Sequence, residues 1–134
     1  MFLIQRINLF VMKRPILLIV DDECDIKALY RSIVNRHFDF DIVEANSIKA
    51  LQRVLVDYTP DYVLLDLCLQ DGSGFDVVPA LKQANPNVQI LVITAFNHCK
   101  EKNKATELGA VGLLAKPFER EVLVEYLKQM HKSW

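Results

Sequence analysis

The chain has 134 residues and a net charge of −1, because 16 basic side chains nearly balance 17 acidic ones. This length predicts a single domain that buries its own core. The charge balance argues against direct contact with nucleic acid or with an anionic membrane surface, and no apolar stretch is long enough to span a membrane. Three cysteines without a C-x-x-C pair indicate reduced thiols, so we expect a cytoplasmic location.

Residues 1–14 do not fit the regular pattern that follows them. We therefore predict a domain over residues 15–134 and an N-terminal extension over residues 1–14. Two interpretations of the extension stay open. The favoured one is an extended or misassigned start, and the other is an added strand or helix used in self-association.

Apolar runs typical of buried strands alternate with stretches of helical periodicity from Ile16 onward. Strands are predicted at Ile16–Val20, Asp41–Ala45, Tyr62–Cys68, Gln89–Thr94 and Val111–Ala115. Helices are predicted at Asp25–His37, Ile48–Tyr58 with Ser47 as N-cap, Phe75 onward, His98–Leu108, and Phe118 onward. The inner face of the second helix is predicted to consist of Ile48, Leu51, Leu55 and Tyr58, and that of the last helix of Val122, Leu123, Tyr126, Leu127 and Met130. This alternation predicts an α/β fold, a flavodoxin-like doubly wound sheet of five parallel strands in the order 2-1-3-4-5 with five helices.

Polar side chains follow four of the predicted strands. Asp21 and Asp22 follow the first strand, Asp66 lies near the end of the third, Thr94 ends the fourth, and Lys116 follows the fifth. Because ligands bind outside the carboxyl ends of parallel strands, we expect these side chains to share one cleft. Three neighbouring carboxylates repel one another, and a hard cation such as Mg²⁺ relieves that repulsion. Asp66 could then attack a phosphoryl group held by Lys116 and Thr94.

Five motifs in this order resemble the receiver domain of bacterial response regulators, over Pro15 to about Met130. They are Val20-Asp21-Asp22-Glu23, Leu64-Leu65-Asp66, Asp71-Gly72-Ser73-Gly74, Ile93-Thr94-Ala95 and Lys116-Pro117-Phe118. Each motif alone is weak, but all five at these spacings are highly specific.

The resemblance implies a role for each residue at the cleft. Asp66 would be the phosphoacceptor. Asp21, Asp22, Asp66 and the backbone carbonyl of Cys68 would hold Mg²⁺, with Asp21 acting through water. Thr94 would be the switch hydroxyl and Lys116 the lysine that pairs with the phosphate, followed by a cis bond to Pro117.

The resemblance also implies a function, a phosphorylation-dependent signalling switch. The phosphoryl group would come from a sensor histidine kinase or a phosphotransfer protein, and it would alter binding to a downstream partner or output domain. Such a domain is a switch rather than an enzyme, with only self-catalysed transfer and slow autodephosphorylation. Homodimers through the fourth and fifth helices are a further expectation from the family.

Three features depart from the family pattern. Leu113 stands where an aromatic residue is usual, which would weaken the coupling between the phosphate and the surface. Gln70 replaces a proline in the loop after the acceptor, which should loosen that loop. Phe96 and Cys68 lie at positions that tune the lifetime of the phosphate, and we hypothesise that Phe96 shields it from water.

Other functions are weighed against this one. The leading alternative is a receiver-fold protein-binding module with weak phosphate-to-surface coupling, which Leu113 motivates. An FMN-binding electron carrier of the same fold is rejected, because Asp21-Asp22-Glu23 would repel a phosphate that no metal bridges. Taken singly, these acidic residues would also fit an ordinary helix start. The joint placement of all the motifs at one edge argues against coincidence.

Overall fold

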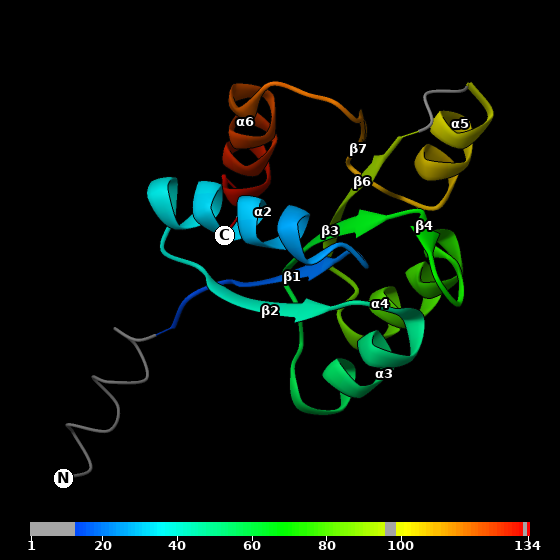
Figure 1. The fold of residues 1–134 in the computed structure, drawn as a ribbon. Helices are drawn as coiled ribbons and strands as arrows, with labels where there is room; N and C mark the ends of the chain where they lie inside the picture. The colour runs from blue at the N-terminus through cyan, green and yellow to red at the C-terminus, as the bar shows by residue number, and fades with distance from the viewer. Residues whose placement is uncertain (1–12, 96–98, 133) are drawn as a thin grey trace, which may run out of the picture.

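A five-stranded parallel sheet forms the centre of the computed structural model, which describes residues 13–95, 99–132 and 134 (Figure 1). The strand order is β2-β1-β3-β6-β7, which is the predicted order 2-1-3-4-5 in terms of the five parallel strands. The strands are β1 (Ile16–Val20), β2 (Asp41–Ala45), β3 (Tyr62–Asp66), β6 (Gln89–Thr94) and β7 (Gly112–Ala115).

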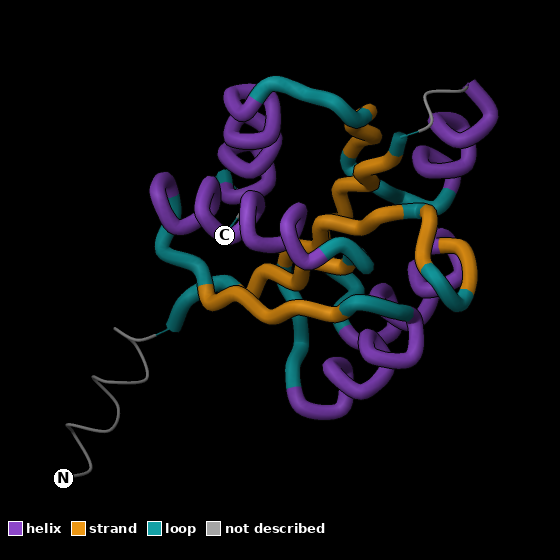
Figure 2. The backbone as a smooth tube through the Cα atoms, viewed as in Figure 1, coloured by secondary structure: helices purple, strands orange, loops and turns teal. Residues whose placement is uncertain are grey.

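Within the described residues, five α-helices cover the two faces of this sheet, as the flavodoxin-like fold requires (Figure 2). They are α2 (Cys24–His37), α3 (Ile48–Asp57), α4 (Val78–Ala84), α5 (Cys99–Glu107) and α6 (Arg120–His131), with a 3₁₀ turn η1 (Gly74–Val77) before α4. Helices α2 and α6 lie on one face, and the others lie on the opposite face. Within the described residues, no helix combines the length and apolarity needed to cross a membrane.

Alternation along the strands sends successive side chains into two separate cores. One core lies under α3, α4 and α5 and includes Leu18, Val20, Val63, Leu65, Val92, Leu51, Leu81 and Ala105. The other, which we call the α2/α6 core, includes Leu17, Ile19, Leu64, Ile93, Leu114, Tyr30, Ile33, Leu123 and Leu127. A strand buried on both faces reads as a continuous apolar run, which is why the strands could be found from the sequence.

The third strand ends earlier than predicted. It stops at Asp66, and Cys68 instead begins β4 (Cys68–Leu69), which pairs in an antiparallel hairpin with β5 (Gly72–Ser73). The backbone N–H of Cys68 donates to the Asp66 carboxylate at 3.0 Å, so the chain turns back at this point instead of extending the sheet. The predicted third helix likewise starts with the tighter turn η1.

Two side chains predicted to face inward lie at the surface. Tyr58 follows the end of α3 in an extended conformation and is 46% exposed. Val122 in α6 is 39% exposed, and Val124 is buried in its place. The helix begins at Arg120 rather than at Phe118, so its buried stripe is Leu123, Val124, Leu127 and Met130.

Several predictions concern residues outside the described ranges. Residues 1–12, most of the proposed extension, lie there, and the described Lys13 and Arg14 belong to no helix or strand. The predicted helix start at His98 and the shielding hypothesis for Phe96 also fall outside the described residues. They stay predictions.

Replacing Ser47 by alanine is expected to lower the free energy of unfolding by about 1 kcal/mol. The Ser47 hydroxyl oxygen accepts a hydrogen bond from the backbone N–H of Ala50 at 3.0 Å, which caps α3 as predicted. Urea denaturation measures the loss. Ser47→Asp is the control and should keep most of the stability, because an aspartate oxygen can accept the same hydrogen bond. Equal losses in the two variants would contradict the cap.

Candidate functional site

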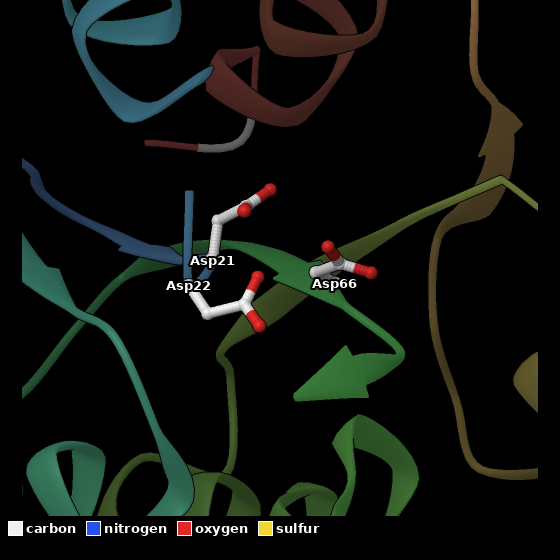
Figure 3. A group of neighbouring side chains, drawn as sticks. All are labelled: Asp21, Asp22 and Asp66. Carbon is white, nitrogen blue, oxygen red and sulfur yellow. The ribbon is translucent and has the colours of Figure 1, made fainter. Parts of the chain in front are cut away.

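The carboxyl ends of neighbouring strands bring the predicted site residues together. Asp21 and Asp22 follow β1, and Asp66 ends β3, the strand paired with β1 (Figure 3). On the other side of β3, Thr94 ends β6 and Lys116 follows β7. The sheet order therefore explains why residues as distant in sequence as Asp21 and Lys116 meet.

Strand alternation also selects which side chains meet. The side chains two residues before Asp21, Asp66 and Lys116 all belong to the α2/α6 core, namely Ile19, Leu64 and Leu114. Since alternate residues share a face, these three site residues continue on the face that α2 and α6 cover. Thr94 lies two residues after Val92 in β6, and Val92 belongs to the other core. Thr94 therefore points to the opposite face of the sheet.

Three carboxylates form a compact acidic group. One oxygen each of Asp21, Asp22 and Asp66 lie within 4.8 Å of one another. Asp21 and Asp66 are buried, whereas Asp22 is exposed. Mg²⁺ prefers oxygen ligands, uses few carboxylates and keeps several waters. A group with two buried carboxylates and one at the surface fits such an ion, because it leaves coordination positions open on the solvent side.

The Lys116 ammonium joins the two buried carboxylates. It donates to Asp21 Oδ2 at 3.1 Å and to Asp66 Oδ2 at 3.2 Å. Burial on its own would lower the pKa of Lys116, but electrostatic interactions with Tyr30, Asp66 and Asp21 outweigh it and raise that pKa. Lys116 is therefore fully charged at neutral pH and compensates part of the buried negative charge.

Asp66 is held in an environment that disfavours its ionised form. Burial raises its pKa most strongly, and the neighbouring Asp21 adds to the rise. The Cys68 N–H and the Lys116 ammonium act in the opposite direction, since both stabilise the carboxylate. Asp66 is thus a partly desolvated carboxyl group with a cation and a backbone N–H beside it.

The remaining predicted residues surround this group. Thr94 is fully buried, and its carbonyl oxygen accepts a hydrogen bond from the backbone N–H of Lys116 at 2.7 Å. The Lys116–Pro117 bond is cis, as the resemblance implies. Leu113 is partly buried and packs on the α3/α4/α5 core, so it is a core leucine.

Gly74, to which the sequence assigns no role, lies against the backbone of Asp66. Its N–H donates to the Leu67 carbonyl at 2.9 Å, and a Cβ at this position would overlap the carbonyl oxygen of Asp66. This contact brings the backbone at the start of η1 directly behind Asp66. The only sequence signal was a glycine in a turn-rich segment, which does not say what approaches it.

A Gly74→Ala substitution is expected to lower the free energy of unfolding by about 2 kcal/mol, because backbone must move to admit the methyl group. The displaced Asp66 backbone should also weaken Mg²⁺ binding. Thermal unfolding and calorimetric Mg²⁺ titration measure the two effects. The neighbouring Ser73→Ala variant is the control, since it loses a capping hydroxyl without adding atoms near Asp66. A Gly74→Ala variant with unchanged Mg²⁺ affinity would show that this contact does not position Asp66.

Comparisons with known proteins agree on one family. The profile of the response regulator receiver domain matches residues 17–128. The photosynthetic apparatus regulatory protein RegA of Rhodobacter capsulatus is 33% identical over 78% of this chain, which spans only 55% of that relative. Sporulation initiation phosphotransferase F of Bacillus subtilis is 28% identical over 84% of this chain and 90% of its own. The non-phosphorylated HemR receiver domain from Leptospira biflexa superimposes with a TM-score of 0.79 at 25% identity, over 87% of this chain and 94% of that domain.

Proposed function

This chain belongs to the family of response regulator receiver domains, and on that premise we propose that Asp66 is the phosphoacceptor of a phosphorylation-dependent signalling switch. The observation that carries the proposal is the position of the Lys116 ammonium, within hydrogen-bonding distance of both the Asp21 and Asp66 carboxylates. The exposed Asp22 completes the acidic group beside them. A nucleophile, a cation and a metal-binding group are thus adjacent.

In the proposed reaction, a carboxylate oxygen of Asp66 attacks the phosphorus of a phosphohistidine on a sensor histidine kinase or a phosphotransfer protein. The O–P bond forms as the N–P bond breaks, and the departing imidazole keeps the electron pair and takes up a proton. Later attack by water on the phosphorus returns the carboxylate and releases inorganic phosphate.

The other site residues bind and orient the phosphoryl group. Asp21, Asp22, Asp66 and the Cys68 carbonyl would hold Mg²⁺, which neutralises charge on the transferring group. Lys116 would leave its carboxylate partners to pair with a phosphoryl oxygen, and the Thr94 hydroxyl would bind another. In this proposal the chain catalyses only its own phosphorylation and slow dephosphorylation.

The proposed output is a change in the affinity for a downstream protein or output domain. We assign residues 15–134 to the receiver domain and residues 1–14 to an extension outside it. Phosphorylation would also favour a homodimer through α5 and α6. A cytoplasmic location is part of the proposal, because the free thiols of Cys24 and Cys68 are exposed and suit a reducing compartment.

A second candidate is a receiver-fold binding module with weak coupling between the phosphate and the surface. Leu113 favours it, since a core leucine at this position has no ring to reorient and no hydroxyl to move into or out of solvent. The two candidates share the chemistry at Asp66 and differ only in whether phosphorylation changes binding.

The proposal is tested by intact mass after incubation with acetyl phosphate, in Mg²⁺ and in excess EDTA. We expect one phosphoryl adduct that requires Mg²⁺ and that peptide mapping assigns to Asp66. Size-exclusion chromatography of the same samples then separates the two candidates, because a changed elution volume indicates a coupled switch. An adduct on another residue, or an equal yield in EDTA, would refute the proposed site.

A further inference from the structure

A cavity of about 520 Å³ lies beside the acidic group, between α2 and the connection from β7 to α6. Its walls are mostly apolar, and Lys116 lies in its lining together with Tyr30 and Phe118. The same lysine therefore faces both the carboxylates and this cavity. No part of the proposed phosphoryl chemistry uses the cavity or Tyr30.

Tyr30 is a buried tyrosine in the lining of this cavity. It is only 3% exposed, and its ring stacks on Phe118 with the ring centres 6.1 Å apart and the planes 23° apart. Among the hydrogen bonds of the described residues, none involves the Tyr30 hydroxyl, although buried hydroxyls nearly always have a partner. The pKa of Tyr30 is raised to about 12, mainly by burial. At neutral pH the group is thus a neutral phenol.

The charged groups around Tyr30 locate its hydroxyl near the site. Lys116, Asp21, Asp66 and Glu23 all shift the pKa of Tyr30 through their charges, and Lys116 lines the same cavity. The neutral phenol oxygen can accept a hydrogen bond through its lone pairs. The Tyr30 oxygen is therefore a hydrogen-bond acceptor near the Lys116 ammonium, which in this structure donates to Asp21 and Asp66.

When a divalent cation binds, the Lys116 ammonium needs another hydrogen-bond acceptor. The metal takes oxygens of Asp21 and Asp66, the same carboxylates that hold Lys116. The Lys116 side chain is only 20% exposed, so water replaces few of the lost hydrogen bonds. Apart from the cation Arg120, the other side chains that line the cavity are apolar. The Tyr30 oxygen is the acceptor available in that lining.

We propose that Tyr30 is a positioning residue for Lys116, whose ammonium donates to the Tyr30 hydroxyl oxygen when a divalent cation occupies the acidic group. The inference rests on the proposed function, since it assumes that the acidic group binds Mg²⁺. In this proposal Tyr30 favours the transfer of Lys116 from the carboxylates to the tyrosine hydroxyl, and also Mg²⁺ binding itself. It gives Lys116 a defined place beside the incoming phosphoryl group, and Mg²⁺ binding gives the buried hydroxyl its missing partner.

The test is a double-mutant cycle with the full chain, in which Mg²⁺ affinity is measured by isothermal titration calorimetry. Tyr30→Phe removes only the hydroxyl and should weaken Mg²⁺ binding about tenfold, the value of one hydrogen bond to a charged group. In the Lys116→Ala background, the same substitution should leave the affinity unchanged. A purely structural role of Tyr30 would give the same loss in both backgrounds.

Tyr62→Phe is the matched control. Tyr62 is also buried, but its hydroxyl bonds to His131 at 2.9 Å, at the opposite end of the sheet. This variant should bind Mg²⁺ as the wild type does. Equal affinities of the wild type and Tyr30→Phe would overturn the role of Tyr30 while leaving the proposed function intact. A wild-type chain that does not bind Mg²⁺ would overturn both, and thermal unfolding of each variant verifies that the phenylalanine substitutions fold.

Discussion

An Asp66→Asn variant is expected to acquire no phosphoryl group from acetyl phosphate, even with Mg²⁺ in excess. The asparagine amide has no charged oxygen to attack phosphorus, and it removes one of the three carboxylates that would hold the metal. Intact mass measures the loss, which should be complete within detection.

The same variant should be more stable than the wild type at neutral pH when Mg²⁺ is absent. The pKa of Asp66 is raised in the folded state, mainly by burial. A carboxyl with a raised folded-state pKa favours the native state below its unfolded-state pKa, and this advantage is lost as the pH rises through the folded-state value. At neutral pH the ionised Asp66 therefore costs stability, and a neutral amide of the same shape avoids that cost.

Asp76→Asn is the control for both effects, because Asp76 is an exposed carboxylate in the nearby turn η1. It should keep the adduct and the stability of the wild type. A phosphoryl adduct on the Asp66→Asn protein would show that another residue is the acceptor. A loss of stability in Mg²⁺-free buffer would show that the partners of Asp66 outweigh its burial.

A Lys116→Met variant is expected to lose about 3 kcal/mol of unfolding free energy without Mg²⁺, since breaking a buried ion pair leaves uncompensated charge. The loss lies at the low end of the usual range because the Lys116 side chain is 20% exposed. Methionine keeps the apolar part of the side chain, so the change in stability reports the contribution of the ammonium alone. Chemical denaturation at neutral pH measures the loss.

Mg²⁺ should reverse most of this loss. With the ammonium gone, the metal no longer competes for Asp21 and Asp66, so Mg²⁺ affinity should rise while phosphorylation becomes slower. Lys82→Met is the matched control, because among the described residues Lys82 donates only to the carbonyls of Val88 and Gly109. An equal Mg²⁺-dependent recovery in the control would mean that Lys116 does not compete with the metal.

The sequence predicted the fold in detail where burial leaves a continuous apolar pattern. The strands β1, β2 and β6 have the predicted bounds, and the cap of α3 by Ser47 is present. The prediction was wrong where the chain leaves the sheet. Cys68 is apolar enough to extend β3 in sequence, but a side-chain hydrogen bond to Asp66 turns it into a hairpin. Tyr58 and Val122 were wrongly predicted to face inward, because the end of a helix can shift by one or two residues without a change in the apolar pattern of the sequence.

The sequence by itself determined which chemical groups this protein has and the order in which they occur. Residue types, motif spacing and strand periodicity were enough to place Asp21, Asp22, Asp66, Thr94 and Lys116 at one edge of a parallel sheet. These are local properties, because each one depends on a few consecutive residues and on the general rule that strands in such a sheet run in the same direction.

Only the tertiary structure decided which of these groups lie together. The Lys116 ammonium bridges Asp21 and Asp66, Gly74 lies behind Asp66, and Tyr30 of α2 lines the same cavity as Lys116. Each contact joins residues from different elements, and it depends on helix orientation and strand parity that no short stretch of sequence specifies. Tyr30 has the spacing of an ordinary core residue in its helix, and the role that we propose for its hydroxyl arises only because α2 and the segment after β7 line the same cavity.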